Sequence, residues 1–322
     1  MGTSSLGAAI ITKNSENTIG DCISSILPFC SQIVIVDTGS TDSTPSICQK
    51  IGAELHFFKW IDDFSKARNY GLNLLRTDWI ISIDSDEQLV SKTLGNNLIN
   101  LTRNELGGLS VILNSRLGSE ENYTESKHRY TRIFKNHPLI KFEGRIHEQI
   151  SKSILDSGFE IIETDIVIEH SGYLNNSQEK VKRNRDLLNL ELINNPDDPW
   201  LKFHLAETEF SAGELEISFK LYNSIKDSGL LSVEQTQKTL LRLAQIELKR
   251  DNHEGLEKRL NFIGYNNDFE GLRKYVLGTS YLVRKQIGVA KKLLMSEEVN
   301  SSKLVDKKNL EATLNLIEIL SN

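Results

Sequence analysis

Several features that would place a chain in a special class are scarce in this sequence of 322 residues. No window approaches the ~20 apolar residues that a membrane-spanning helix requires, which predicts no stable membrane span. The net charge is −6, so the chain as a whole has no general attraction for nucleic acid, and we expect no nucleic-acid partner. Residues 1–5 lack the charged and apolar regions of a signal peptide, and this argues against export by that route.

Cysteine is also scarce, because the chain has only Cys22, Cys30 and Cys48 and no C-x-x-C pair. Cys22 and Cys48 stand among apolar residues at helical spacing, which is typical of buried free thiols rather than of catalytic cysteines. This usage favours a reducing compartment, and we expect a cytoplasmic protein. The hydrophobic content of 39% and charged content of 25% are those of an ordinary globular chain, with room for about two domains.

The first ~100 residues alternate strand and helix patterns. Short apolar runs predict strands at 6–12, 33–36, 54–58 and 79–83, and apolar residues at helical spacing predict helices at 19–27, from Thr44-Pro45 onward, and at 64–75. This alternation predicts an α/β fold with a parallel, doubly wound sheet covered by helices. Ligands bind at the carboxyl ends of the strands in such sheets, and Asp37 and Asp84 both fall there.

The pattern changes after residue 108. Strands are predicted at 109–113, 130–134, 140–146 and 161–168 without long helices between them, and an antiparallel extension of the sheet accounts for them. A helix is predicted at 179–192, followed by a turn-rich break at 194–199.

Beyond that break, a leucine followed directly by alanine or glycine recurs within segments that have helical spacing of apolar residues. Leu205-Ala206, Leu243-Ala244 and Leu277-Gly278 stand 38 and 34 residues apart, close to the ~34-residue period of the tetratricopeptide repeat. Gly213, Tyr222, Tyr281, Ala290 and Leu294 also resemble that repeat, although its usual tryptophan is absent. An unrelated helical bundle is the alternative.

Two acidic residues, Asp84 and Asp86, follow the fourth predicted strand with Ser85 between them. Adjacent carboxylates repel one another, so this pattern favours a bound cation, and oxygen ligands suit Mg²⁺ or Mn²⁺. Such triplets also occur by chance in exposed turns, so the context decides.

The context is a set of polar residues on the same edge of the sheet. Thr12 and Asn14 end the first strand, and Asp37 opens the segment DTGSTD after the second. A carboxylate accepts hydrogen bonds from base N–H groups or ribose hydroxyls. The alternative is a strand-to-helix turn, in which Thr44 caps the following helix. Arg68 has the planar guanidinium that suits a diphosphate, or it lies on a solvated helix face.

Together these segments resemble the family 2 inverting glycosyltransferases of the GT-A fold. The matching segments are 11–14, 36–44, 67–69 and 84–87, in order, and the resemblance spans about 6–173. It implies that Thr12, Asn14, Asp37 and Arg68 bind the nucleotide of a UDP-sugar. It further implies that Asp84 and Ser85 lie toward the ribose, and that Asp86 binds Mn²⁺ or Mg²⁺ bridging the diphosphate.

Segments 63–69, 142–148 and 168–173 resemble a branch of this family with a helical-repeat C-terminus. That branch includes enzymes that glycosylate peptide bacteriocins. The resemblance therefore extends to nearly the whole chain and points to a peptide or protein acceptor.

Inverting transfer is one in-line displacement at the anomeric carbon, and it needs a base on the acceptor side. We predict Glu148 as that base and His170 as an added metal or diphosphate contact, with His147 as a second candidate for that contact. Alternatively, Glu148 orients Arg145 and His170 is a hydrogen-bonded histidine at a strand end. Arg132 either contacts phosphate or lies on a solvated edge strand.

We therefore predict a GT-A catalytic domain at 1–175, followed at 176–322 by an all-α, tetratricopeptide-like domain that binds the acceptor or forms a homodimer. The predicted function is metal-dependent transfer of a hexose or N-acetylhexosamine from a UDP-sugar to a Ser, Thr or Cys side chain. A second interpretation keeps the donor but places the sugar on a lipid-linked or surface polysaccharide. A third, from another class, is a catalytically inactive repeat scaffold.

Overall fold

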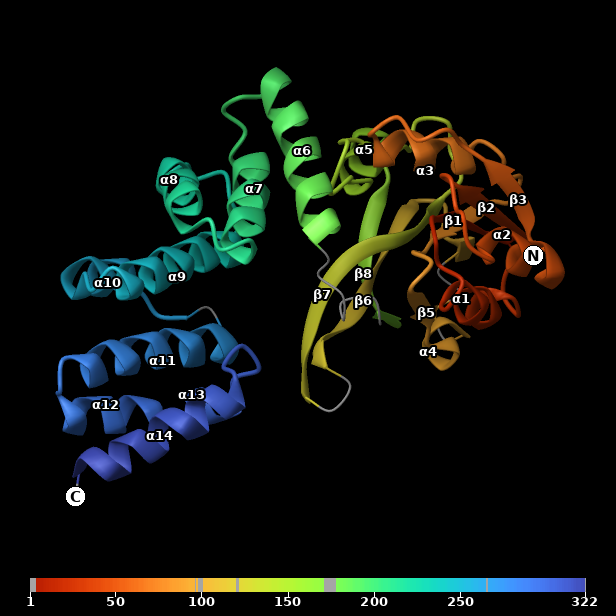
Figure 1. Cartoon of the computed structure of the whole chain (residues 1–322). Helices are drawn as coiled ribbons and strands as arrows, with labels where there is room; N and C mark the ends of the chain where they lie inside the picture. Colours follow the sequence, from red (N-terminus) through yellow and green to blue (C-terminus); the bar gives the residue numbers. More distant parts are fainter. Residues whose placement is uncertain are drawn as a thin grey trace. The chain divides into compact units, whose positions relative to one another are not determined.

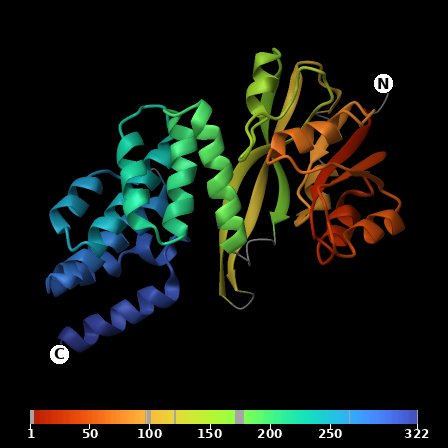
Figure 2. The same ribbon diagram turned by 45° about the horizontal axis from the view of Figure 1, so that its top comes forward.

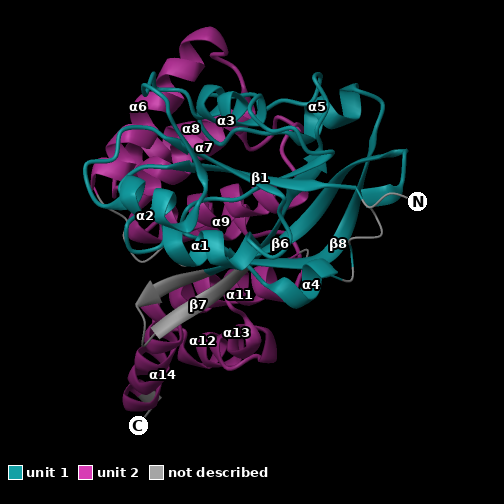
Figure 3. Cartoon of the chain, turned by 90° about the vertical axis from the view of Figure 1, so that its right-hand side faces the viewer, with its two compact units in different colours: residues 1–176 teal, residues 177–322 magenta. Residues whose placement is uncertain are grey.

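The computed structural model describes residues 4–95, 97, 101–119, 122–170, 178–264 and 266–321. It divides into two compact units, unit 1 at Met1–Asn176 and unit 2 at Ser177–Asn322 (Figure 3). The domain boundary predicted at 175–176 lies outside the described residues, as does the end of the 168–173 motif.

Unit 1 is built on an eight-stranded mixed sheet in the described part of the chain, with the order β3-β2-β1-β4-β7-β6-β8-β5 (Figure 1). Its strands are β1 (Leu6–Thr12), β2 (Gln32–Asp37), β3 (Glu54–Phe57), β4 (Trp79–Ser82), β5 (Glu87–Leu89), β6 (Leu106–Ser119), β7 (Asn122–Lys135) and β8 (Glu160–His170). β1 to β4 pair in parallel, as predicted. The extension is antiparallel at β4–β7, β6–β7 and β5–β8, but β6 and β8 pair in parallel.

Helices cover both faces of this sheet, as Figure 3 shows. They are α1 (Ile19–Ile26), α2 (Thr44–Ile51), α3 (Phe64–Leu72), α4 (Ser91–Gly95) and α5 (Ser151–Asp156). One apolar core joins α1, α2 and α4 to the sheet, and a second joins α3 and α5 to its other face. The predicted stripe of α1 is buried, but Leu27 caps the helix and is 51% exposed.

The strand predicted at 140–146 is wrong. Ile140, Phe142 and Ile146 are buried there, but the segment is a loop closed by a single bridge between Glu143 and Gln149. Phe142 packs edge-to-face on Phe134, with ring centroids 5.8 Å apart. Burial of these apolar residues against the core produced an alternating pattern without a partner strand.

The predicted cap at Thr44 is also wrong. α2 begins at Thr44 with Ser43 as its N-cap residue and no side-chain capping bond from Ser43. The Asp42 carboxylate accepts from the Thr44 N–H at 3.0 Å, while the Thr44 hydroxyl accepts from the Ser15 N–H at 2.7 Å. The hydroxyl therefore joins the loop after β1 to the start of α2 instead of capping its own helix.

β7 contains a bulge that redirects one side chain. Ile133 pairs with Leu109 and Thr131 pairs with Ser110, so Arg132 is the extra residue between them. An extra residue turns its side chain out of the strict alternation and bends the strand. β7 is an interior strand, and the Arg132 side chain is only 13% exposed. The alternative that placed Arg132 on a solvated edge strand is therefore wrong.

All regular secondary structure in the described residues of unit 2 is helical (Figure 2). Its helices are α6 (Gln178–Asn194), α7 (Pro199–Ser211), α8 (Leu215–Ile225), α9 (Val233–Lys249), α10 (His253–Arg259), α11 (Asn267–Val283), α12 (Ile287–Leu294), α13 (Glu297–Ser301) and α14 (Lys307–Ser321). The recurring pairs at 205, 243 and 277 lie on α7, α9 and α11, each packed on the helix that follows it. A Cβ at Gly278 would lie 2.6 Å from the Leu294 side chain, so only glycine allows α11 to approach α12 this closely.

A polar cluster joins the first two hairpins. The Glu207 carboxylate accepts from the Tyr222 hydroxyl and pairs with Lys238 at 2.8 Å and Arg242 at 3.1 Å. Burial opposes its charge, but these two cations lower the pKa of Glu207 to about 2.

In the described part of the chain, no helix is both long enough and apolar enough to cross a membrane.

Candidate active site

The site begins where β1 and β2 end side by side, at the paired residues Thr12 and Asp37. Asp37 is fully buried, and its Oδ1 accepts from the N–H groups of Gly39 and Ser40, both at 2.7 Å. Gly39 has φ 111°, a conformation that favours glycine. Asp37 Oδ2 and Thr12 Oγ1 are buried without a hydrogen-bond partner among the described residues. Buried polar atoms are almost always satisfied, so this pair favours a polar ligand at this position.

Asn14 and Ser85 hold the loops around this pair. Asn14 has φ 51°, and its Oδ1 accepts from the Thr41 N–H at 2.8 Å. The Asn14 N–H donates to the Ser40 hydroxyl at 2.9 Å. The hydroxyls of Ser15 and Ser85 lie 2.8 Å apart, which joins the β1 loop to the loop after β4. The structure thus brings Thr12, Asn14, Asp37 and Ser85 to one edge of the sheet.

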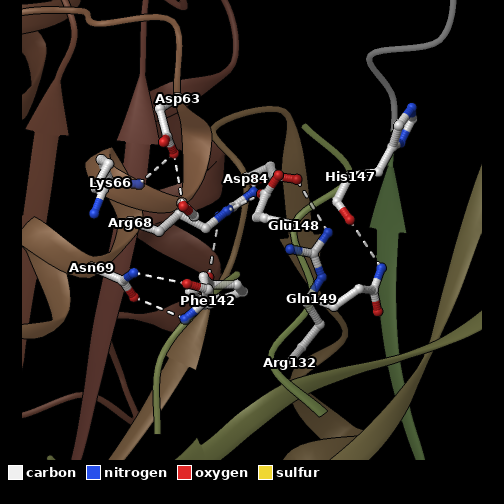
Figure 4. Close-up of polar contacts among 12 residues, drawn as sticks. Asp63, Lys66, Arg68, Asn69, Asp84, Arg132, Phe142, His147, Glu148 and Gln149 are labelled. Carbon is white, nitrogen blue, oxygen red and sulfur yellow. Dashed lines mark hydrogen bonds and ion pairs between the residues drawn. The ribbon is translucent and has the colours of Figure 1, made fainter. Parts of the chain in front are cut away.

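Arg68 lies at the centre of a buried ion-pair network (Figure 4). It is 7% exposed, and its Nη2 donates to Asp84 Oδ1 at 2.6 Å. Its Nε donates to Glu148, and its Nη1 donates to the Ser82 hydroxyl at 3.2 Å. Burial disfavours the charge, but Asp84 and Glu148 raise the pKa of Arg68. Arg68 therefore links the loop after β4 to the loop that carries Glu148.

Arg132 completes the network from the opposite side. Its Nη2 donates to Asp84 Oδ2 at 3.1 Å and to Glu87 Oε1 at 2.7 Å. Glu87 is fully buried, and its Oε2 accepts from the Asp84 N–H at 2.8 Å. Burial and the neighbouring Asp84 raise the pKa of Glu87 to about 7, against the attraction of Arg132. Burial would also raise the pKa of Asp84, but Arg68 and Arg132 hold it well below its usual value.

Removing this second arginine should destabilise unit 1. Arg132→Met leaves the Glu87 carboxylate buried without its cation, so the free energy of unfolding should fall by about 3–5 kcal/mol. Hydrogen exchange of the buried β4 amides measures this fall in the free energy of unfolding. Arg129→Met is the matched control on the same strand, because the partner of Arg129, Glu163, is 73% exposed. Its free energy of unfolding should fall by no more than about 1 kcal/mol. Equal losses for the two variants would show that the Arg132 network does not stabilise the fold.

Asp86 and His170 face each other across the site. The His170 Nε2 lies 3.2 Å from Asp86 Oδ2, and its Nδ1 lies 3.4 Å from the Ser115 hydroxyl. Burial opposes the charged ring, but the hydrogen bond and negative charge of Asp86 raise the pKa of His170.

This pair fits a divalent cation as a partial ligand set. A carboxylate and an imidazole can both ligate Mn²⁺, and the Ser115 hydroxyl lies where it can orient the ring through its second nitrogen. Among the described residues no group of three His, Cys, Asp or Glu side chains is arranged to hold a metal. Asp86 and His170 would hold the cation as two protein ligands, and diphosphate oxygens and water would supply the others.

Glu148 is carried by a short closed loop. The N–H of Glu143 donates to the Gln149 carbonyl at 3.0 Å, and the reverse bond measures 2.9 Å. The N–H of Phe64, the first residue of α3, donates to the Arg145 carbonyl at 2.8 Å, and Arg145 Nη1 donates to the Asp62 carbonyl at 3.3 Å. The residue that Glu148 pairs with is Arg68. His147 has φ 53°, and Figure 4 shows its ring directed away from Arg68.

The sequence analysis gave no individual role to Glu87, Ser115 or Asn69. Glu87 follows the predicted acidic motif directly, and its place at the start of a buried strand was the available signal. Asn69 stands in the matched segment 67–69, but the segment does not show its contact with Phe142. Ser115 stands in a segment without any distinguishing pattern, so only its spatial neighbours reveal a role.

The family model for glycosyl transferase family 2 matches residues 8–170. A TPR repeat-containing protein of Synechococcus elongatus is 28% identical over 66% of this chain and 55% of its own length. The SPbeta prophage-derived glycosyltransferase SunS of Bacillus subtilis is 28% identical over 81% of this chain and 63% of its own length. The chain thus spans between about half and two thirds of these relatives.

Among solved structures, S. aureus TarS matches with a TM-score of 0.44 and 16% identity, over 90% of this chain and 54% of TarS. A structure of TarS 1-349 in complex with UDP-GlcNAc matches with a TM-score of 0.43 and 15% identity, over 90% of each chain.

Proposed function

The chain belongs to glycosyl transferase family 2, and within that family we propose that it moves a hexose or N-acetylhexosamine from a UDP-sugar to a peptide or protein side chain. Unit 1 has the predicted GT-A fold, and unit 2 is the predicted tetratricopeptide-like helical region. The membership makes it a glycosyltransferase. The donor, metal, acceptor and stereochemistry are the proposal.

The observation that carries the donor is the pair of buried, unpartnered atoms at Thr12 and Asp37. A carboxylate oxygen beside a hydroxyl suits the N–H and carbonyl edge of a nucleobase, or a ribose hydroxyl. Asn14 and Ser85 hold the surrounding loops, and Asp84 lies on the same edge. We propose that these residues bind the nucleoside, with the diphosphate extending toward Asp86.

Asp86 and His170 would hold Mn²⁺ or Mg²⁺ together with the diphosphate. When bound, the cation neutralises the charge that develops on the leaving diphosphate. His170 must lose its proton before it ligates a metal, and Asp86 favours that proton. Competition from this proton weakens metal binding by the pair alone. We expect metal binding to strengthen when the diphosphate supplies further ligands.

Glu148 would act as the base. It accepts the proton of the acceptor hydroxyl or thiol while that atom forms a bond to the anomeric carbon. The bond from that carbon to the β-phosphate oxygen breaks, and its electron pair leaves with UDP. Arg68 pairs with Glu148, and this charge-assisted hydrogen bond holds the carboxylate in place. The single in-line step inverts the anomeric centre.

The peptide acceptor rests on the branch resemblance and on unit 2, because stacked helical hairpins build concave surfaces suited to polypeptides. A lipid-linked or surface polysaccharide is the second candidate acceptor. If unit 2 instead forms a homodimer, light scattering of the whole chain should report twice the monomer mass.

The proposal is tested by a hydrolysis screen of nucleotide sugars with Mn²⁺, because slow transfer of the sugar to water requires no acceptor. We expect release of UDP from at least one UDP-hexose or UDP-N-acetylhexosamine, and none without the cation. Preference for a guanosine or thymidine diphosphate sugar would contradict the uridine assignment. Absence of hydrolysis and of UDP binding would contradict the donor site as a whole.

A further inference from the structure

The residue after Arg68 makes an unusual double contact with the loop that precedes Glu148. Asn69 Nδ2 donates to the Phe142 carbonyl at 2.9 Å, and the Phe142 N–H donates to Asn69 Oδ1 at 2.9 Å. Both backbone groups of one residue are thus satisfied by one side chain of α3, as Figure 4 shows. A strand would satisfy them with a neighbouring strand, which this segment lacks.

Only a primary amide can make this contact at this length. An amide has a donor and an acceptor side by side, matching the N–H and C=O of a single extended residue. Aspartate would set a carboxylate against the Phe142 carbonyl, and alanine would leave both backbone groups without this partner. Loss of such bonds in a partly buried position destabilises the loop locally.

Phe142 stands at the entrance of the loop that carries Glu148. The bridge from Glu143 to Gln149 closes that loop one residue later. The Phe142 ring packs on Phe134 and lies 5.3 Å from the Arg68 guanidinium. The same turn of α3 therefore holds the loop at two points, through Asn69 at its start and through Arg68 at Glu148 itself.

We propose that Asn69 is a positioning residue. It fixes the distance between the sheet and the loop at 142–149, and it thereby directs the Glu148 carboxylate toward the acceptor. This inference rests on the proposed function of Glu148. It assigns to α3 a second role: Arg68 pairs with the Glu148 carboxylate, and Asn69 fixes where the loop that carries it lies. Small misplacements of a reacting group cost up to ~10² in rate, so a backbone clamp this close to the base has a measurable effect.

The test is a double-mutant cycle on the whole chain. The activity measured is hydrolysis of UDP-glucose, or of the UDP-sugar that the screen identifies, in the presence of Mn²⁺. The binding of UDP with Mn²⁺ is measured by calorimetry. Asn69→Ala should lower kcat by a factor of about 10–10² and leave the Kd of UDP within about twofold. In a Glu148→Gln background, the same change should cost less than about twofold, because residues that act through one another are not additive.

Hydrogen exchange provides a readout that does not depend on activity. Asn69→Ala should speed exchange of the amides in 142–149 and leave those of β4 protected. Asn69→Asp, which keeps the side-chain size, should behave the same way and serves if the alanine variant folds poorly. Asn136→Ala is the matched control, because Asn136 donates to the carbonyls of Leu75 and Thr77 at 3.1 and 2.8 Å, before the start of β4. It should lower stability without changing kcat.

The outcomes separate the two proposals. Unchanged exchange at 142–149, an equal kcat loss in both backgrounds, or a large rise in the Kd of UDP would overturn the positioning role. If the unmodified chain neither binds UDP nor hydrolyses any UDP-sugar, the proposed function fails instead, and the exchange data still decide whether Asn69 holds the loop.

Discussion

Substituting glutamine for Glu148 should lower sugar transfer by a factor on the order of 10²–10⁴, the usual contribution of a general base. Glutamine keeps the length of the side chain and a hydrogen bond from Arg68, but it cannot accept the acceptor's proton. Arg68 retains its bond to Asp84 at 2.6 Å, so the donor edge of the sheet should persist. Initial rates should therefore fall while calorimetry shows the Kd of UDP with Mn²⁺ nearly unchanged.

Glu143→Gln is the matched control, since Glu143 lies on the same loop with its side chain 49% exposed and 3.8 Å from Lys141. It should keep near-normal activity. Transfer above a tenth of normal in Glu148→Gln would show that Glu148 is not the base, and a loss in Glu143→Gln would transfer that role to Glu143. With a cysteine acceptor the penalty of Glu148→Gln should shrink, because a thiol is already partly ionised near neutral pH.

Replacing Asp86 by alanine should abolish most of the metal-dependent affinity for UDP, a loss on the order of 10²-fold. Asp86 supplies one of the two protein ligands proposed here, and its removal leaves His170 alone. Calorimetry of UDP with and without Mn²⁺ should give nearly the same Kd for the variant but different values for the unmodified chain.

Asp21→Ala serves as the control, because Asp21 is an exposed carboxylate in the first turn of α1 and its loss changes the net charge equally. It should keep the metal dependence. Equal UDP affinity with and without Mn²⁺ in the unmodified chain would refute the metal assignment, and full metal dependence in Asp86→Ala would move the ligand elsewhere.

The parallel half of the sheet could be predicted because its signals are local. Strands β1, β2 and β4 are short runs of apolar residues, many of them small or β-branched, and most are buried. Helices and turns separate these strands along the chain. The carboxyl ends of parallel strands share one edge, so Thr12, Asp37 and Asp84 could be placed together from the strand pattern alone. The helical pairs on α7, α9 and α11 were likewise readable from their spacing.

The loop that carries Glu148 could not be read this way. Ile140, Phe142 and Ile146 are buried in the spacing that a strand would give. The Phe142 backbone, however, bonds to the Asn69 side chain, and the one bridge of the segment joins Glu143 to Gln149. Periodicity reports which side chains are buried, and it does not report which groups satisfy the backbone. The same holds for Thr44, whose hydroxyl bonds across to Ser15.

The sequence by itself therefore determined the order of the elements, the edge at which polar side chains gather and the kinds of chemistry those side chains allow. Only the tertiary structure decided the partners: Arg68 meets Glu148 across 80 residues, Asp86 meets His170 across 84, and a bulge turns Arg132 toward Glu87. The physical reason is the difference in range between sequence patterns and atomic contacts. Burial patterns repeat every two or 3.6 residues, whereas an ion pair or hydrogen bond depends on atoms within ~4 Å, which the folded chain alone brings together.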